Sequence, residues 1–129
     1  MLHTSHPAVP SSVPVARDLV VAIADRGGAS TERLECVRLA VSEALTNAVE
    51  RGDSSEVHVR ATVFGRQLAV LVAADCDDTP GMGFGLALIA ACSDDFVVGT
   101  TASGGVQIEM RFDLDATDRP PSSVAASAL

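Results

Sequence analysis

The spacing of apolar residues predicts two helices in the first part of the chain. Over residues 15–26, and again over residues 31–50, apolar side chains recur every three or four positions. This is the period of a helix that buries one face. Ser30 or Thr31 is expected to cap the second helix, and the basic residue and glycine at 51–52 are expected to end it.

The same reading predicts two strand hairpins and a third helix in the rest of the chain. Residues 57–64 alternate in polarity and residues 67–74 are apolar almost throughout, which is typical of an interior strand. A short helix is expected over about 84–92, followed by strands over 96–101 and 106–114. Hairpins without alternating crossovers predict an α+β fold. We expect a two-layer sandwich with a mostly antiparallel sheet and helices on one face.

The chain is expected to form one domain with two loose ends. Its 129 residues suit a single core. Residues 1–12 are polar and contain prolines, which suggests a flexible leader, and residues 115–129 are rich in Pro, Ser and Ala, which suggests a disordered tail. The domain itself would span residues 13–114. The N-terminus lacks the pattern of a signal peptide and no apolar run is long enough for a membrane span, so we expect a cytoplasmic protein.

Composition narrows the chemistry. Hydrophobic residues make up 47% of the chain, with no Trp, no Tyr and four Phe, so the core should be mainly aliphatic. A net charge of −8 argues against direct binding to nucleic acid. The three cysteines are far apart, which disfavours a zinc site or a disulfide framework. We expect Cys36 and Cys92 to pack as small apolar groups in a reducing compartment.

The second predicted helix carries a carboxylate and an amide that belong to neither of its main faces. Val37, Val41 and Leu45 form the apolar stripe, whereas Glu43 and Asn47 lie four positions apart on another side of the helix. Burying such groups costs a few kcal/mol unless they are paired, so a ligand, a metal ion or an internal polar network is expected there. The alternative is that both side chains are solvated at the edge of the stripe.

A glycine-rich turn precedes the third predicted helix. Gly81, Gly83 and Gly85 would let backbone N–H groups approach phosphates at the positive end of that helix. The turn lacks the Lys-Ser/Thr of a P-loop and the strand spacing of a Rossmann site, and it can equally mean flexible backbone. Two acidic segments, at 75–78 and 94–95, are more typical of charged loops and solvated turns than of sites.

Together, these residues resemble a known family. Residues 39–52 are similar to the helix motif of the anti-sigma-factor serine kinases, a branch of the histidine-kinase-like (Bergerat-fold) ATPases. The two glycine boxes of that family fall on residues 75–79 and 81–86, and its closing strand falls on residues 104–108. The resemblance extends over about residues 12–114. It implies the same two-layer sandwich that the hairpins predict.

The resemblance also implies a function and a role for each motif residue. Glu43 would be the general base, Asn47 would hold Mg²⁺ against the phosphates of ATP, and Asp75 would bind the adenine amino group. The reaction would transfer the γ-phosphoryl group to a serine of an antagonist protein. The regulator would also bind a sigma factor, and relatives often form homodimers. The glycines that would approach the phosphates are Gly81, Gly83 and Gly85.

Several positions depart from the family pattern. Asp77 and Thr79 replace the glycines of the first box, Arg51 stands where the family has His, and Val106 replaces a threonine. Only residues 76–82 separate Asp75 from Gly83, so the usual ATP lid is missing. Two hypotheses follow. The chain is an active ATP-dependent serine kinase and anti-sigma factor, or it is a non-catalytic binding module with weak or lost nucleotide binding.

Overall fold

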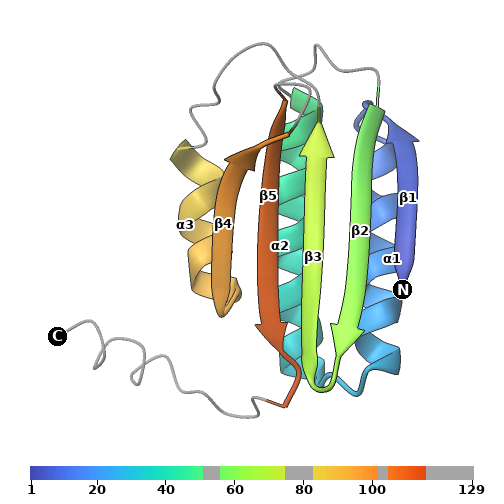
Figure 1. The fold of residues 1–129 in the computed structure, drawn as a ribbon, viewed down its shortest axis with the longest axis vertical. Helices are drawn as coiled ribbons and strands as arrows, with labels where there is room; N and C mark the ends of the chain where they lie inside the picture. Colours follow the sequence, from blue (N-terminus) through green and yellow to red (C-terminus); the bar gives the residue numbers. More distant parts are fainter. Residues whose placement is uncertain (51–55, 75–82, 102–104, 116–129) are drawn as a thin grey trace, which may run out of the picture.

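A computed structural model describes residues 1–50, 56–74, 83–101 and 105–115. Within them, five antiparallel strands form one sheet in the order β1-β2-β3-β5-β4, and three helices cover one of its faces (Figure 1). This confirms the predicted α+β sandwich with helices on one face. In chain order the elements are β1 (Leu2–Pro7), α1 (Ser12–Arg26), α2 (Thr31–Glu50), β2 (Glu56–Phe64), β3 (Gln67–Ala74), α3 (Gly83–Cys92), β4 (Asp95–Thr100) and β5 (Val106–Asp113).

Both predicted hairpins are present, as β2–β3 and β4–β5, with β4 at one edge of the sheet. β3 lies between β2 and β5, so it is the interior strand that its continuous apolar run predicted. Ala74 at the end of β3 pairs with Val57 on one side and Val106 on the other. The predicted third helix is α3, which begins at Gly83, whereas Gly81 of the predicted turn lies outside the described residues.

The expected flexible leader at residues 1–12 is wrong. Leu2–Pro7 form the edge strand β1, which pairs antiparallel with β2 from Leu2 opposite Ala61 to Pro7 opposite Glu56. The sequence did not predict this strand because it contains few apolar residues. Only its alternate residues are half-buried, and the others are exposed. Pairing with β2 supplies the backbone hydrogen bonds that favour the extended form, and a proline at its last position suits an edge strand.

Helix starts and buried faces follow from local sequence. The Arg33 backbone N–H donates to Ser30 Oγ at 3.2 Å, so Ser30 is the cap of α2. Of the two predicted caps, Ser30 and Thr31, the structure therefore selects Ser30. Val37, Val41 and Leu45 are buried along this helix, which confirms its predicted stripe. The corresponding stripe of α1 consists of Ala16, Val20 and Ala24.

The core lies between the helices and the sheet. It is mainly aliphatic, as the composition predicted, and its largest fully buried side chains include Phe112, Leu68, Ile89 and Met110. Cys92 belongs to this core and Cys36 packs against it, as expected. Phe64 lies apart from the core and is 75% exposed. No helix in the described part of the chain is long and apolar enough to cross a membrane.

Candidate functional site

The C-terminal half of α2 carries the two polar residues that the sequence singled out. Glu43 and Asn47 are both half-buried, whereas Val41 and Leu45 on the neighbouring face are buried. Asn47 Nδ2 is buried and has no hydrogen-bond partner among the described residues. A buried amide N–H without an acceptor is unfavourable by about 1–3 kcal/mol, so this position is suited to an acceptor from outside the described protein.

The start of α3 faces the same end of the molecule. α2 and α3 run antiparallel, so the first turn of α3 lies toward the end of the sandwich where α2 finishes (Figure 1). Gly83 and Gly85 lie in that first turn. The first N–H groups of a helix have no intrahelical acceptor and carry the positive end of its dipole. The C-terminal half of α2, which carries the amide and the carboxylate, and a helix start suited to an anion therefore lie toward the same end of the sandwich.

Other predicted site residues lie outside the described residues. These are Asp75 and Gly81, together with the remaining residues of the acidic segment at 75–78. Strand β3 ends at Ala74, directly before Asp75. The roles assigned to Asp75 and Gly81 therefore remain predictions from the resemblance.

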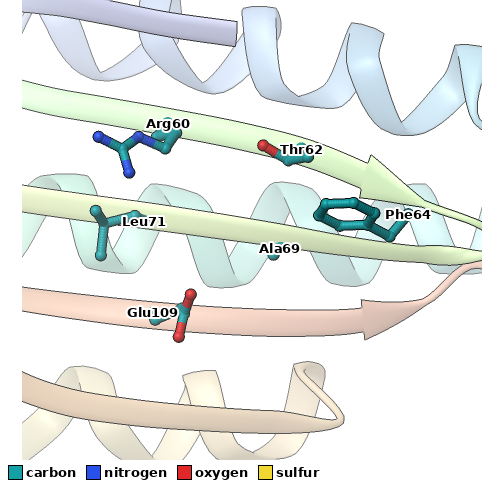
Figure 2. A pocket seen from close by; sticks show the side chains of 6 residues that line it. All are labelled: Arg60, Thr62, Phe64, Ala69, Leu71 and Glu109. Atoms are coloured by element: carbon teal, nitrogen blue, oxygen red, sulfur yellow. The ribbon is translucent and has the colours of Figure 1, made fainter. Parts of the chain in front are cut away.

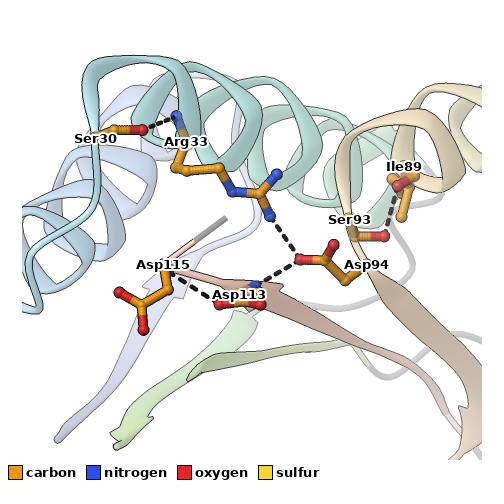
Figure 3. Close-up of polar contacts among 7 residues, drawn as sticks. All are labelled: Ser30, Arg33, Ile89, Ser93, Asp94, Asp113 and Asp115. Atoms are coloured by element: carbon orange, nitrogen blue, oxygen red, sulfur yellow. Dashed lines mark hydrogen bonds and ion pairs between the residues drawn. The ribbon is translucent and has the colours of Figure 1, made fainter. Parts of the chain in front are cut away.

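A buried ion pair connects the opposite ends of the same two helices. Arg33 Nη2, in the first turn of α2, lies 2.6 Å from Asp94 Oδ2, two residues after α3 (Figure 3). The same carboxylate oxygen accepts a hydrogen bond of 2.5 Å from the Asp113 backbone N–H in β5. The two side chains are only 11% and 15% exposed. This cluster holds α2, the end of α3 and β5 in a defined arrangement.

The expectation of a solvated turn at residues 94–95 is wrong for Asp94. Its carboxylate is covered because Arg33 and the end of β5 both contact it. Arg33, the buried charged residue of the described core, was overlooked in the sequence. The signal was available, since Arg33 stands four positions before Val37 and eight before Val41 on the apolar stripe of α2.

Comparison with known proteins agrees with this geometry. The family model for the histidine kinase-like ATPase domain matches residues 6–112, most of the chain. The chain belongs to the histidine kinase-like ATPase domain family. The match begins within β1, so the edge strand that the sequence reading missed overlaps the family match.

Among curated members, the chain is similar to proteins named serine-protein kinase RsbW. It is 37% identical over 75 residues to that of Bacillus subtilis strain 168, covering 55% of this chain and 47% of the relative. It is 35% identical over 71 residues to that of Oceanobacillus iheyensis, covering 52% and 45%. For Bacillus licheniformis the identity is 39% over 71 residues, covering 52% and 44%. The chain thus spans about half the length of the curated relatives it matches.

The residues present fit the group that a histidine kinase-like ATPase domain implies. The Asn47 carboxamide offers an oxygen for Mg²⁺ and N–H groups for a phosphate oxygen, and the buried Nδ2 still lacks an acceptor in the described structure. Mg²⁺ commonly uses only one or two protein ligands and takes the rest from phosphates and water. No cluster of three or more His, Cys, Asp or Glu side chains suited to a metal occurs among the described residues. A single amide ligand is compatible with Mg²⁺ bound together with a nucleotide.

Proposed function

We propose that this chain is an anti-sigma-factor-like regulator that binds ATP and Mg²⁺ and phosphorylates a serine of an antagonist protein. The observation that carries the proposal is the buried Asn47 Nδ2, which has no hydrogen-bond partner among the described residues, on the helix that also presents Glu43. The similarity to the RsbW serine-protein kinases supports the choice of a serine as the acceptor. The proposed setting is transcription regulation in the cytoplasm.

Each residue of the site has one task in this proposal. Asn47 would hold Mg²⁺, and the chemistry that the ion would supply is neutralisation of phosphate charge. Glu43 would accept the proton of the serine hydroxyl as that oxygen attacks the γ-phosphorus and the bond to the leaving ADP breaks, which would make it a general base. Backbone N–H groups at Gly83 and Gly85 receive the phosphate oxygens, with Gly81 before them. Asp75 accepts a hydrogen bond from the adenine amino group.

The alternative function is a non-catalytic module that binds the same protein partners. The observation in its favour is the chemical composition of the first glycine box. Asp77 and Thr79 replace the glycines of the first box, and added negative charge near a triphosphate opposes binding. Only residues 76–82 separate Asp75 from Gly83, which leaves little chain to exclude water from the reaction.

Calorimetric titration with ATP and Mg²⁺ separates the two functions at the binding step. The proteins to compare are the wild type, Asn47→Ala and Ser42→Ala, the last being a matched control on the same helix. Micromolar binding in the wild type and the control, lost in Asn47→Ala, supports the nucleotide site. Absence of binding at millimolar ATP in all three proteins overturns it and favours the non-catalytic module.

The proposed partners are a sigma factor, an antagonist protein and a second copy of this chain. For the second copy, the sheet face turned away from the helices supplies an argument. Five residues in register cross this open face, one from each strand. In spatial order they are His3, Arg60, Leu71, Glu109 and Val97.

The charges of the open face are arranged so that two copies of this face would be complementary to each other. Arg60 and Glu109 flank Leu71 and line a shallow hollow of about 160 Å³ with Thr62 and Phe64 (Figure 2). A two-fold axis along β3 exchanges the β2 side of one sheet with the β5 side of the other. It would place Arg60 of one copy opposite Glu109 of the second and Leu71 against its own counterpart. We therefore propose a face-to-face homodimer through this surface.

Charge reversal tests this dimer in sedimentation equilibrium experiments. Arg60→Glu or Glu109→Arg alone places like charges opposite each other at two positions of the interface, so each is expected to weaken association. The double variant restores opposite charges and is expected to recover it. Arg26→Glu, at the exposed end of α1, is the control for net charge. A wild-type monomer at high concentration, or a double variant no better than the singles, contradicts the proposed face.

A further inference from the structure

Three basic side chains gather on the β1–β2 side of the open face. His3 lies directly opposite Arg60 in the register of these strands, and His58, two positions before Arg60 on β2, lies opposite Ser5. The side chains of His3, His58 and Arg60 line one hollow of about 210 Å³. Its other lining residues are apolar: Val59, Leu71 and Ala73. The hollow therefore combines basic and apolar walls, with no carboxylate among its lining residues.

Arg60 has no acidic partner among the described residues. Five of the other arginines in the described ranges pair with an Asp or Glu side chain: Arg17, Arg33, Arg38, Arg66 and Arg111. Figure 2 shows the Arg60 guanidinium group extending away from Thr62, toward the start of β2, which is the direction of His58. In a chain of net charge −8, this cation is open to an anion that the described residues do not supply.

The carboxylates nearest in register lie outside the hollow. Glu56 is two positions before His58 on β2, and Glu109 is on β5, two strands away from β2. Neither of them lines the hollow. Because His3 and Arg60 are direct cross-strand neighbours, they repel each other when both are charged. An anion bound between them would relieve this repulsion.

A hydrogen bond orients the His58 ring toward such a ligand. Ser5 Oγ lies 2.8 Å from His58 Nδ1, across the β1–β2 pair. Because Nδ1 is engaged by the hydroxyl group, the second ring nitrogen, Nε2, is left to meet a ligand. His6 differs, since it lies on the other side of β1, where its Nε2 is 2.8 Å from Thr4 Oγ1.

We propose that His3, His58 and Arg60 form a binding site for a phosphate group, supplied as free phosphate or as a phosphomonoester. The planar guanidinium fork of arginine matches two phosphate oxygens, and a protonated imidazole donates a further hydrogen bond. The hollow has room for a phosphate group with several waters, since one water occupies about 30 Å³ of the liquid. The apolar floor provided by Leu71 and Ala73 keeps water from one side of the anion, which strengthens the attraction.

This site is separate from the proposed nucleotide site. The helices cover the opposite face of the sheet, and Asn47 belongs to that helix layer (Figure 1). In the proposed homodimer, Glu109 of the second copy lies opposite Arg60, so a bound phosphate and the second copy would compete for the same guanidinium. This competition rests on the proposed homodimer, whereas phosphate binding itself does not.

The test titrates the full chain with inorganic phosphate and follows its imidazole signals by NMR, at about pH 6, where imidazoles carry positive charge in part. The protein is kept at a concentration where sedimentation shows a monomer, and sodium chloride holds the ionic strength constant. The His3 and His58 signals should shift together and saturate with a Kd of about 1 mM or lower. The His6 signal should stay in place. O-phosphoserine, with serine as its control, then shows whether a phosphomonoester binds more tightly than free phosphate.

Two charge-matched variants decide whether the site is specific. Arg60→Gln removes the guanidinium of the hollow and should raise the Kd about tenfold or more, as expected for the loss of one charged hydrogen-bond partner. Arg26→Gln removes the same charge at the exposed end of α1 and should bind like the wild type. A drift without saturation, equal shifts of all three imidazoles, or equal losses in the two variants would overturn the site.

The outcome also distinguishes this site from the proposed homodimer. Saturable phosphate binding by a chain that stays monomeric at high concentration would retain the phosphate site and overturn only the homodimer. A homodimer that forms as proposed from a chain that binds neither phosphate nor O-phosphoserine as a monomer would overturn only the phosphate site.

Discussion

Arg33 Nη2 contacts Asp94 Oδ2 at 2.6 Å in a part of the molecule where both side chains are nearly covered. The same oxygen accepts the Asp113 N–H, so one carboxylate joins the start of α2, the segment after α3 and the end of β5. Buried pairs of this kind are costly to break because the remaining partner keeps its charge without compensation.

Asp94→Ala is therefore expected to lower the free energy of unfolding by about 3–5 kcal/mol, because it leaves the Arg33 guanidinium buried without its carboxylate. Asp95→Ala is the matched control, since Asp95 is the next residue and is exposed, and it should change the stability by less than about 1 kcal/mol. Urea unfolding followed by circular dichroism measures both. Similar losses in the two variants would show that the ion pair has no special role.

Asn47→Ala should separate stability from binding. It removes a buried N–H that lacks an acceptor in the described structure, so the ligand-free protein should keep its stability within about 1 kcal/mol or gain slightly. The increase in Tm on adding ATP and Mg²⁺ should disappear, because the variant no longer holds the metal and phosphate. Thermal unfolding with and without nucleotide gives both numbers. A large loss of stability without ligand would mean that Asn47 is satisfied inside the protein.

Glu43→Gln is expected to retain ATP binding and lose phosphoryl transfer. The substitution preserves size and hydrogen bonding but removes the proton acceptor, which contributes about 10²–10⁴-fold to such reactions. Phosphate incorporation into a candidate antagonist protein measures the rate, and calorimetry measures the affinity. Wild-type transfer rates in this variant would exclude Glu43 as the general base.

From the raised pKa of the Cys92 thiol, we predict how the free energy of unfolding changes at high pH under reducing conditions. Its pKa is raised above the ordinary value of 9.0, chiefly by burial, so the unfolded chain releases this proton at lower pH than the folded chain. The contribution of this protonated thiol to the free energy of unfolding is fully present below pH 9.0 and is lost as the pH rises through the pKa of Cys92 in the folded protein. The free energy of unfolding should fall above that pH, and less steeply in Cys92→Ala. Equal slopes in the two proteins would contradict this.

The sequence by itself determined the features that depend on near neighbours. The helical period of α2, the Ser30 cap, both hairpins and the placement of Glu43 and Asn47 on one side of α2 all follow from residues within a few positions. Turn chemistry and side-chain periodicity depend on neighbouring residues, so they can be predicted without knowledge of the fold. The two-layer α+β class followed from the order of these elements.

Tertiary structure decided the features that join distant residues. β1 is a strand because β2 pairs with it, although its own sequence is polar. Arg33 is buried because Asp94, 61 positions later, pairs with it, and Cys36 and Cys92 share one core because α2 packs on α3. Local patterns do not specify which partner a strand edge, a charge or a thiol will meet. Packing of the helices and register of the sheet supply that partner.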